Sequence, residues 1–308
     1  MPFEKIVLIT RRTRLMELIA RYNSRPQAKF AIDRAGGNFA DYEGEDEAYR
    51  KALDTLRGGL SRLLKVQVVD REFVPSFLFA EKDLVVTAGQ DGLVANTAKY
   101  VNGQPILAVN PDPERFDGLL LPFTVGEASP AVQRLLAGKG RLRAVTLAEA
   151  RLNDAQRLLA FNDLFIGARS HVSARYLIRF RDRWEQHSSS GVIVSTGAGS
   201  TGWMSSVFHM AAGVMTFAGQ PVPAVKVQMD WEDERLLFAV REPFLSRTSQ
   251  VGLVAGMIAP GEVLVIESRM PGGGVIFSDG MEADFLQFNS GASARIRIAG
   301  KKAHLVVK

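Results

Sequence analysis

Three short segments, in a fixed order along the chain, carry residue types that can act on a phosphorylated substrate. They are residues 87–92 (Thr-Ala-Gly-Gln-Asp-Gly), 161–163 (Phe-Asn-Asp) and 195–203 (Ser-Thr-Gly-Ala-Gly-Ser-Thr-Gly-Trp). Each follows an apolar run directly. Together they offer a phosphate loop with one carboxylate, two polar side chains that can hold a ribose, and a polar turn closed by an aromatic ring. This combination favours a kinase that acts on a nucleotide.

The first segment has the composition of a phosphate-binding loop. Backbone amides at a glycine-rich turn and at a helix N-terminus bind phosphate oxygens, and Gly89 to Gly92 lie between an apolar run and an expected helix. Asp91 is the acid of this loop. A carboxylate there can accept a proton from an attacking hydroxyl, or hold Mg²⁺ at the phosphates. The segment lacks the ending of a Walker A loop, and taken alone it also fits a simple turn.

The second segment places an amide and a carboxylate side by side. Asn162 and Asp163 interrupt an apolar run at 158–166. Such a pair can donate to and accept from two neighbouring hydroxyl groups of a sugar. Taken alone, it also fits a bulge or a tight turn in a hairpin.

The third segment matches Gly-x-Gly-x-x-Gly at residues 197–202, which is also the fingerprint of dinucleotide-binding dehydrogenases. That fingerprint should begin a βαβ unit and be followed by an acid about 20 residues later. Here the match lies among expected strands, and Asp230 comes 28 positions after Gly202. The dehydrogenase hypothesis is therefore less favoured.

The elements of the first 110 residues alternate between strands and helices, which is typical of a three-layer α/β domain with a mostly parallel sheet. Ligands of such sheets bind outside the carboxyl ends of the strands, where the Gly89–Gly92 loop lies. Residues 23–44 are rich in glycine and charge and are expected to form a loop or insertion. Strands are expected at 5–10, 66–69, 83–87 and 106–109, and helices at 11–22, 45–64 and 91–100.

The pattern changes after about residue 125. A helix is expected at 130–136, and short β-rich runs separated by turn residues follow, which predicts a β-rich, sandwich-like domain. The boundary is expected at 122–127, giving domains 1–124 and 125–308. The expected strands are 142–146, 158–166, 174–180, 192–195, 222–228, 236–240, 251–258, 263–266, 275–277, 294–298 and 304–307.

Composition limits the alternatives. The 308 residues suggest two domains, with 46% hydrophobic and 23% charged residues. The absence of cysteine excludes disulfides and thiolate metal sites. No apolar run is long enough for a membrane span, so a cytoplasmic protein without membrane partners is expected. The formal net charge of +5 fits nucleic acid, but a positive field also suits small polyanionic substrates, and we expect the latter.

Taken together, the segments resemble the NAD kinase family, and most closely its mitochondrial type with the bacterial relatives. That family carries a Gly-Gly-Asp-Gly loop, an Asn-Glu pair and a Thr-Gly-rich turn ending in an aromatic residue. Residues 110–115 (Asn-Pro-Asp-Pro-Glu-Arg), 161–167 and 189–191 are similar to segments of the mitochondrial type, as is the helix start at 10–17. The resemblance spans roughly residues 5 to 280.

The resemblance implies a fold, a reaction and roles for individual residues. An α/β domain and a β-rich domain would have the site in the cleft between them, where ATP and Mg²⁺ serve phosphorylation of the adenosine 2′-hydroxyl of NAD. It also implies a homodimer or a higher homo-oligomer. Asp91 would be the base, while the other site residues would line the phosphates, hold the nicotinamide ribose or shape the dinucleotide pocket: Gly89, Gln90, Gly92, Asn162, Asp163, Thr201, Gly202, Trp203 and Ser206.

The sequence also departs from the family pattern. Gln90 replaces the second glycine of the loop, Leu93 replaces a threonine, and Asp163 is one methylene shorter than the family glutamate. These departures leave two other hypotheses open. One is a kinase-like protein that binds NAD or NADP without turnover. The other is a related kinase for a lipid or another small alcohol.

Overall fold

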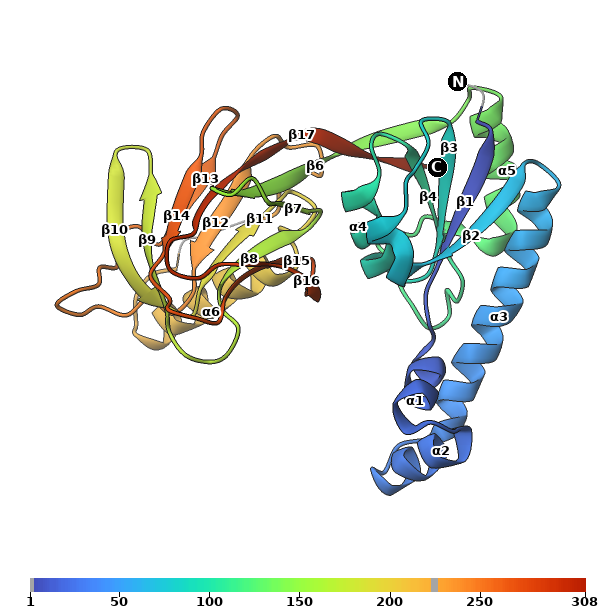
Figure 1. Cartoon of the computed structure of the whole chain (residues 1–308), viewed down its shortest axis with the longest axis horizontal. Helices are drawn as coiled ribbons and strands as arrows, with labels where there is room; N and C mark the ends of the chain where they lie inside the picture. Colours follow the sequence, from blue (N-terminus) through green and yellow to red (C-terminus); the bar gives the residue numbers. More distant parts are fainter. Residues whose placement is uncertain (1–2, 223–226) are drawn as a thin grey trace. The chain divides into compact units, whose positions relative to one another are not determined.

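The chain forms two compact units in the computed structural model, which describes residues 3–222 and 227–308 (Figure 1). The first unit comprises residues 1–143 and 304–308, and the second comprises 144–303. The chain therefore leaves the first unit once and returns to it. The units divide at 143/144, whereas the boundary expected at 124/125 falls immediately before helix α5 (Val125–Leu136) of the first unit.

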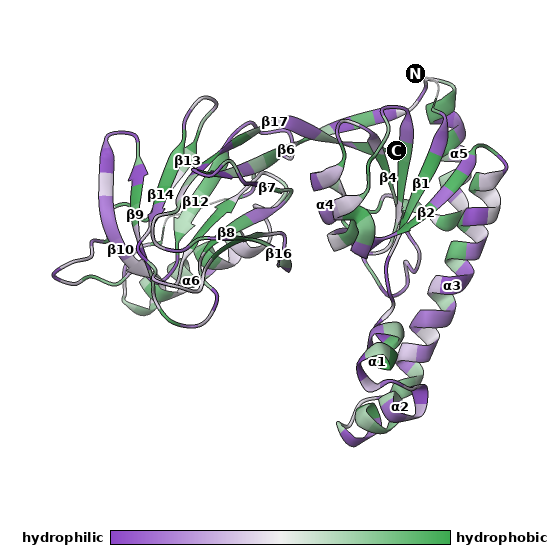
Figure 2. Cartoon of the chain, in the orientation of Figure 1, coloured by the Kyte–Doolittle hydropathy of each residue, from purple (hydrophilic) through white to green (hydrophobic). Residues whose placement is uncertain are grey.

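The first unit is built on a parallel sheet. Its strands follow the order β2 (Lys65–Asp70), β1 (Lys5–Thr10), β3 (Asp83–Ala88), β4 (Pro105–Asn110) and the end of β17 (Ser293–Val307). The short strand β5 (Phe123–Thr124) also pairs with β4. All residues of β3 and β4 are buried, and Figure 2 shows β4 as largely hydrophobic. Such largely apolar strands are typical of parallel sheets covered on both faces.

Helices cover both faces of this sheet. Helices α3 (Phe39–Ser61) and α5 contact each other, and they share a core cluster with Ile6, Leu8 and Val86. Helix α4 (Asp91–Tyr100) and the 3₁₀ helix η1 (Arg71–Ser76) lie on the opposite face (Figure 1). The expected three-layer α/β arrangement is confirmed.

The prediction of a loop at 23–44 is wrong. Helix α1 (Arg14–Tyr22) is followed by helix α2 (Arg25–Arg34), and α3 already begins at Phe39. The Ser24 hydroxyl accepts the Gln27 amide at the start of α2, which is an N-terminal cap. Ala28 is the sole buried residue of α2, so the sequence of this helix lacks the repeating apolar positions that would have predicted it.

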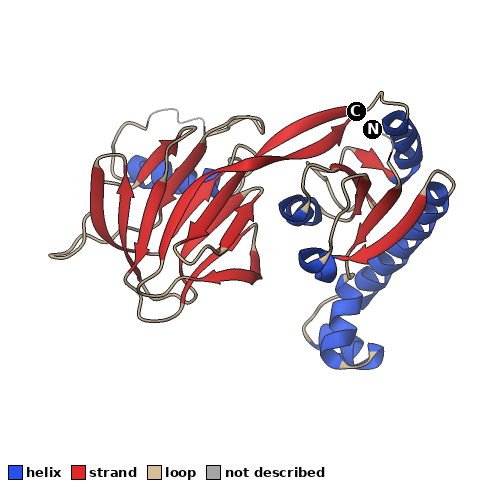
Figure 3. Ribbon diagram, turned by 45° about the horizontal axis from the view of Figure 1, so that its top comes forward, coloured by secondary structure: helices blue, strands red, loops and turns tan. Residues whose placement is uncertain are grey.

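The second unit is made mostly of strands, as Figure 3 shows. One antiparallel sheet has the order β13-β12-β11-β8-β15-β16, and the other contains β10-β9-β14-β17 with β6 and β7. Buried side chains of both sheets form one cluster, which includes Tyr176, Phe238 and Ile266. The sandwich-like prediction is confirmed. The strands are β6 (Arg141–Leu152), β7 (Arg157–Ala160), β8 (Asp163–Ala168), β9 (Ala174–Phe180), β10 (Arg183–Ser189), β11 (Val192–Ser195), β12 (Leu236–Val240), β13 (Ala255–Ile258), β14 (Leu264–Ser268), β15 (Gly274–Ser278) and β16 (Met281–Gln287).

Helix α6 (Trp203–Phe217) packs on the other face of the β8-containing sheet through Met204, which contacts a cluster with Phe165 and Ile193. Strands β10 and β16 were not expected, because charged and polar residues interrupt the apolar pattern in both. The strand expected at 222–228 falls largely on residues outside the described part of the chain.

Candidate functional site

Asp91 is the first residue of α4, and backbone amides fix its carboxylate. Its Oδ2 accepts the Leu119 amide at 3.1 Å and its Oδ1 accepts the Leu120 amide at 2.9 Å. A carboxylate has about four acceptor positions, so these two bonds leave room for a further donor. Asp91 therefore keeps a fixed direction while it retains the capacity to accept a proton.

The loop around Asp91 tolerates the glutamine that replaces a family glycine. Gln90 is exposed and has φ −97° and ψ 169°, which is extended backbone that any residue adopts. Gly89 is packed more closely: a Cβ there would lie 2.7 Å from the end of the Leu93 side chain, which would have to move. A Cβ on Gly92 would meet nothing within 4 Å. The loop therefore keeps its shape with Gln90 in it.

The segment at 110–120 builds the support for Asp91. The Asn110 side chain donates to the Phe116 carbonyl at 2.8 Å and accepts the Asp112 amide at 3.0 Å. Gly118 has φ +64°, and a Cβ there would lie 2.8 Å from Nδ2 of the Asn110 side chain. The Asn-x-Asp-Pro-Glu-Arg segment thus shapes the turn that brings the two amides to Asp91.

Arg11 lies beside the phosphate loop and was not predicted as a site residue. Its Cδ would lie 3.5 Å from a Cβ on Gly89, and its guanidinium forms an ion pair with buried Glu45 at 2.9 Å. Its Nε is buried and has no hydrogen-bond partner among the residues that the structure describes. The signal for this position was present, since Arg11 directly follows β1 and the carboxyl ends of parallel strands meet at one edge.

Tyr49 of α3 ties Arg11 to the phosphate loop. Its hydroxyl donates to the Ala88 carbonyl at 2.8 Å and accepts the Arg11 amide at 2.9 Å. The Arg11 guanidinium lies over the Tyr49 ring, 5.0 Å from its centre. Burial raises the pKa of Tyr49 to about 12, so the hydroxyl stays protonated and keeps donating at neutral pH.

In the second unit, Asp279 holds the Asn162–Asp163 turn. Its carboxylate accepts the amides of Phe161 at 3.0 Å, Asn162 at 2.7 Å and Asp163 at 3.2 Å. Asp279 has φ +54°, in the left-handed region that asparagine and aspartate adopt more readily than most residues. Burial, together with the nearby Asp279 charge, raises the pKa of Asp163 to about 7. The turn therefore offers a carboxyl group that titrates near neutrality.

The glycines of the third segment serve close packing of backbone on backbone. A Cβ on Gly199 would lie 2.1 Å from the Asn162 carbonyl oxygen, and one on Gly197 would lie 1.8 Å from that of Asp230. The Thr196 hydroxyl donates to the Phe161 carbonyl at 2.6 Å. The structure thus brings the second and third predicted segments together.

The remaining predicted residues of this unit lie at the start of α6. Thr201 and Gly202 are exposed, and Trp203 is half-buried and stacks on Phe165, with ring centres 5.7 Å apart. Ser206 is exposed one turn later. Arg241, which the sequence interpretation missed, places its guanidinium 5.3 Å from the centre of the Trp203 ring.

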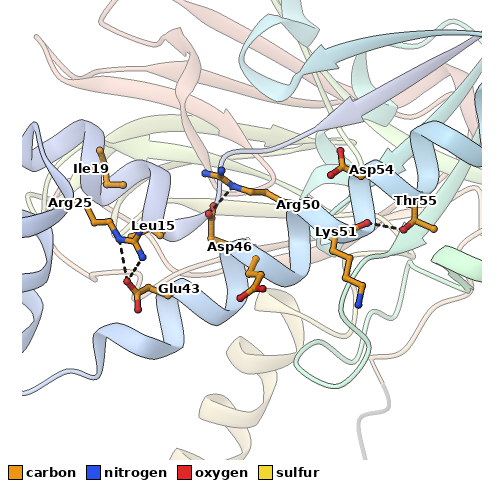
Figure 4. A pocket seen from close by; sticks show the side chains of 10 residues that line it. Leu15, Ile19, Arg25, Glu43, Asp46, Arg50, Lys51, Asp54 and Thr55 are labelled. Carbon is orange, nitrogen blue, oxygen red and sulfur yellow. Dashed lines mark hydrogen bonds and ion pairs between the residues drawn. The ribbon is translucent and has the colours of Figure 1, made fainter.

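A pocket of about 650 Å³ beside α1 and α3 contains none of the predicted site residues (Figure 4). Two ion pairs lie among its charged side chains: Arg25 pairs with Glu43, and Arg50 pairs with Asp46 at 2.8 Å. Asp46 also accepts the Thr13 hydroxyl at 2.6 Å. These bonds tie α1, α2 and α3 to one another.

The residues that the structure describes contain no group of three or more histidine, aspartate or glutamate side chains able to hold a metal ion. Within the same residues, no helix has the length and apolar character that crossing a membrane requires.

Comparison with known sequences gives relatives of one kind, although no family model matches the chain. It is 28% identical to NAD kinase 2, mitochondrial, of Rattus norvegicus over 264 residues, covering 63% of this chain and 61% of that protein. It is 31% identical to an NAD kinase of Heliobacterium modesticaldum over 130 residues, covering 39% of this chain and 44% of the relative. The chain thus spans about three fifths or less of the length of these relatives.

Comparison with solved structures extends over nearly the whole chain. A crystal structure of an NAD kinase from Archaeoglobus fulgidus in complex with ATP matches with TM-score 0.58 and 14% identity, covering 98% of this chain and 92% of that one. The yeast NADH kinase complexed with NADH matches with TM-score 0.61 and 14% identity, covering 100% and 84%. The two-unit fold is the fold of these enzymes.

Proposed function

We propose, from the relationship of this chain to the NAD kinase family, that it transfers a phosphoryl group from ATP to the adenosine 2′-hydroxyl of NAD and so forms NADP. The sequence relatives support the reaction class, and the fold agrees with it. The observation that carries the proposal is Asp91, an acid at a helix N-terminus whose direction two backbone amides fix.

In the proposed reaction the 2′-oxygen of NAD attacks the γ-phosphorus of ATP. The bond to the β,γ-bridging oxygen breaks, ADP leaves, and the hydroxyl proton passes to the Asp91 carboxylate. Positioning and electrostatic stabilisation provide most of the catalysis in such transfers. The N-terminal end of α4 supplies amide donors and a positive dipole end for phosphate oxygens.

The donor set suits Mg²⁺. This ion binds through one or two carboxylates together with substrate phosphates and water, and Asp91 is the carboxylate that the loop offers. When bound, Mg²⁺ would neutralise charge that develops on the phosphates. Arg11 and Arg14 share the single charge of Glu45, so this trio carries a net positive charge beside Gly89.

The second unit is proposed to bind the acceptor. Asn162 and Asp163 offer an amide and a carboxyl group to the nicotinamide ribose. Trp203 offers a ring face beside Thr201 and Gly202, and Ser206 offers a hydroxyl one turn along α6. Support for this assignment comes from the direct packing of the second segment on the third.

Purified protein incubated with ATP, Mg²⁺ and NAD tests the proposal, with NADP measured by a dehydrogenase specific for that dinucleotide. We expect Asp91→Asn to lower kcat by about 10²- to 10⁴-fold, because a positioned general base contributes that much. The matched control is Asp54→Asn, which changes an exposed acid on α3. Full activity of Asp91→Asn would remove Asp91 from the role of base.

Gln90 favours a second candidate, a protein that binds NAD or NADP without turnover. Its exposed side chain caps no amide of α4 and stands at the end of the helix where a phosphate would bind. In that case calorimetry would show dinucleotide binding without ATP-dependent product, and Gln90→Gly would restore turnover. A parallel assay with diacylglycerol tests the related lipid kinase activity.

We also propose a cytoplasmic protein that assembles as a homodimer or larger homo-oligomer, as the resemblance implies. Light scattering coupled to size-exclusion chromatography measures the assembly directly. A mass of 33.7 kDa, that of one chain, would contradict it.

A further inference from the structure

The outer face of one sheet in the second unit carries exposed arginines on several strands. This sheet contains β10, β9, β14 and β17 together with β6 and β7, and its inner face joins the core through residues such as Tyr176, Ile178 and Ile296. Side chains alternate between the two faces along a strand, so the residues between these core positions point outward. The exposed outward arginines of β6, β7, β9 and β17 are Arg151, Arg157, Arg175, Arg179, Arg295 and Arg297.

The strand register brings these arginines into the same part of the face. Val265 of β14 is paired with Arg179 on one side and with Arg295 on the other. Arg151 is paired with Arg157 in the β6–β7 hairpin. A depression of about 310 Å³ is lined by Arg179, Arg295 and Val265, among others. Like charges at opposed positions destabilise a sheet, so an anionic partner would relieve this repulsion.

Acidic side chains leave much of this positive charge unpaired. The glutamates that share the face each lie near an arginine: Glu149 near Arg297, Glu262 near Arg181 and Glu267 near Arg269, at 2.9, 2.8 and 3.7 Å. Four other arginines form no ion pair with any residue that the structure describes: Arg151, Arg175, Arg179 and Arg295. Burial and the charge of Arg157 lower the pKa of Lys301 on β17, as a positive field does. The face is therefore cationic.

An exposed tryptophan lies beside the arginines. Trp184 of β10 is paired with Arg179, and it is 61% exposed. Proteins that hold single-stranded nucleic acid combine cationic groups along the backbone with aromatic rings on which the bases stack. Trp184 and Arg179 place one ring and one cation next to each other in this way.

The arginines are spread too widely for one small anion to contact them together. A strand rises about 3.3 Å per residue, and neighbouring strands lie about 4.8 Å apart. Arg175 and Arg179 are therefore separated by about 13 Å along β9, and Arg157 lies four strands from Arg179, at roughly 19 Å. A chain of phosphates can contact these positions one after another. The net charge alone does not distinguish a small polyanion from a polymer, but this placement favours the polymer.

Three other partners fit this face less well. A second copy of the same face would bring arginine against arginine. Insertion into a lipid surface uses exposed apolar side chains, but Leu177 of this face is half-buried and Val265 is buried. Duplex nucleic acid offers phosphates but hides the ring faces of its bases, which leaves Trp184 without a partner.

We propose that this face binds single-stranded nucleic acid, with the arginines on the phosphates and the Trp184 ring stacked on a base. Arginine forks bind phosphate oxygens through charge-assisted hydrogen bonds. The surface is independent of the proposed kinase reaction, because none of its residues serves in that reaction. A protein without kinase activity leaves this proposal intact.

Fluorescence anisotropy of labelled oligonucleotides tests the proposal on the full chain. The probes are a single-stranded RNA, the single-stranded DNA of the same sequence and the corresponding DNA duplex. We expect both single strands to bind more tightly than the duplex, and the tighter of the two identifies the sugar that the face prefers. Duplex binding as tight as that of the single strands, or binding only to vesicles that contain phosphatidylserine, would overturn the proposal.

Arginine variants test the cationic part of the surface. Arg179→Gln combined with Arg295→Gln should weaken the tighter single strand by about tenfold or more, since charge-assisted hydrogen bonds are lost. The slope of log affinity against log salt should fall by about 1.4, because each phosphate contact contributes about 0.7. The matched control combines Arg34→Gln with Arg57→Gln, which removes the same charge from exposed positions of α2 and α3. Equal weakening of both double variants would refute the site, because net charge alone would then explain the binding.

The variant Trp184→Ala tests the stacking. It should weaken the single strand by about tenfold while duplex binding stays the same, so that the preference for single strands is reduced. Because the side chain is 61% exposed, the midpoint of thermal unfolding should stay close to that of the wild type, which shows that the fold is retained. An unchanged preference for single strands would contradict the role of Trp184.

Discussion

At the scale of single residues, the described structure assigns opposite tasks to two neighbouring acids. Asp279 gives its carboxylate to three backbone amides and so shapes the turn at 161–163. Asp163 is half-buried, and this burial together with the Asp279 charge raises its pKa to about 7. One acid is therefore structural, while the other is left to titrate within the proposed acceptor site.

The raised pKa of Asp163 predicts a pH-dependent stability. Between about pH 4, where the unfolded side chain ionises, and about pH 7, the folded state binds the extra proton, so the stability of the wild type falls as pH rises. Asp163→Asn lacks this proton and should gain stability relative to wild type from pH 4 to pH 8. Urea unfolding across that range measures the difference, and Asp54→Asn should show none. A constant difference for Asp163→Asn would contradict the raised pKa.

Two glycines predict opposite effects of the same substitution. Gly199→Ala should destabilise the chain by more than about 2 kcal/mol, because its Cβ would collide with the Asn162 backbone at 2.1 Å and neither backbone can move freely. Gly213→Ala should stabilise by up to about 1 kcal/mol, since it lies within α6 and its Cβ meets nothing within 4 Å. Thermal unfolding of both proteins measures the contrast. Equal midpoints would contradict the packing role of Gly199.

At the scale of elements, the phosphate loop depends on a helix that the sequence places far from it. Tyr49 of α3 bridges the end of β1 and the end of β3 through one hydroxyl. Arg11 lies between the rings of Tyr49 and Phe116, with centres at 5.0 and 6.0 Å. Helix α3 thus orients the cation beside Gly89.

Removal of the Tyr49 hydroxyl should impair the use of ATP more than the use of NAD. Tyr49→Phe leaves the ring in place but leaves the Arg11 amide and the Ala88 carbonyl without their partner, which should cost about 1–3 kcal/mol of stability. The Michaelis constant for ATP should rise, while that for NAD should stay within about twofold, since the Tyr49 hydroxyl bonds to Arg11 and to Ala88 beside the phosphate loop. Steady-state kinetics with each substrate varied separates the two, and Tyr42→Phe is the control. A rise for NAD alone would contradict the assignment.

Much of this arrangement could be predicted from sequence, for identifiable reasons. Strands such as β3 are largely apolar, and Asp91 lies three residues after the end of β3, so local pattern sufficed for the α/β order and the loop. Edge strands such as β10 carry polar side chains on both faces, and the sequence pattern did not predict them. The three bonds from the Asp279 carboxylate span 116 to 118 residues, and no local pattern could reveal them. Helix α2 was not predicted, because Ala28 is the one residue that it buries and it therefore shows no apolar face.

At the scale of the whole molecule, the last strand serves both units in turn. Residues of β17 pair with β14 in the second unit, and His304 and Leu305 pair in parallel with Pro105 and Ile106 of β4 in the first. Val306 joins the core beneath α5. The sheet that positions Asp91 is therefore completed by residues from the far end of the sequence.

Because the end of β17 pairs with β4, a substitution near residue 305 should destabilise the first unit. Leu305→Ala removes a side chain that is 3% exposed and should destabilise the chain by about 2–5 kcal/mol. Hydrogen exchange should locate the loss at β3 and β4. Val172→Ala, at a position 61% exposed in the second unit, is the control and should change little. Loss of protection confined to residues 144–303 would contradict the prediction.

The returning strand also sets an order of events on the ribosome. Translation makes β1 to β4 early, yet β4 gains its last neighbour only after some 160 intervening residues, 144–303, have been made. Until then the nascent sheet presents an open parallel edge, and such edges template unwanted pairing with other chains. Early termination anywhere in the second unit would therefore yield a fragment that aggregates.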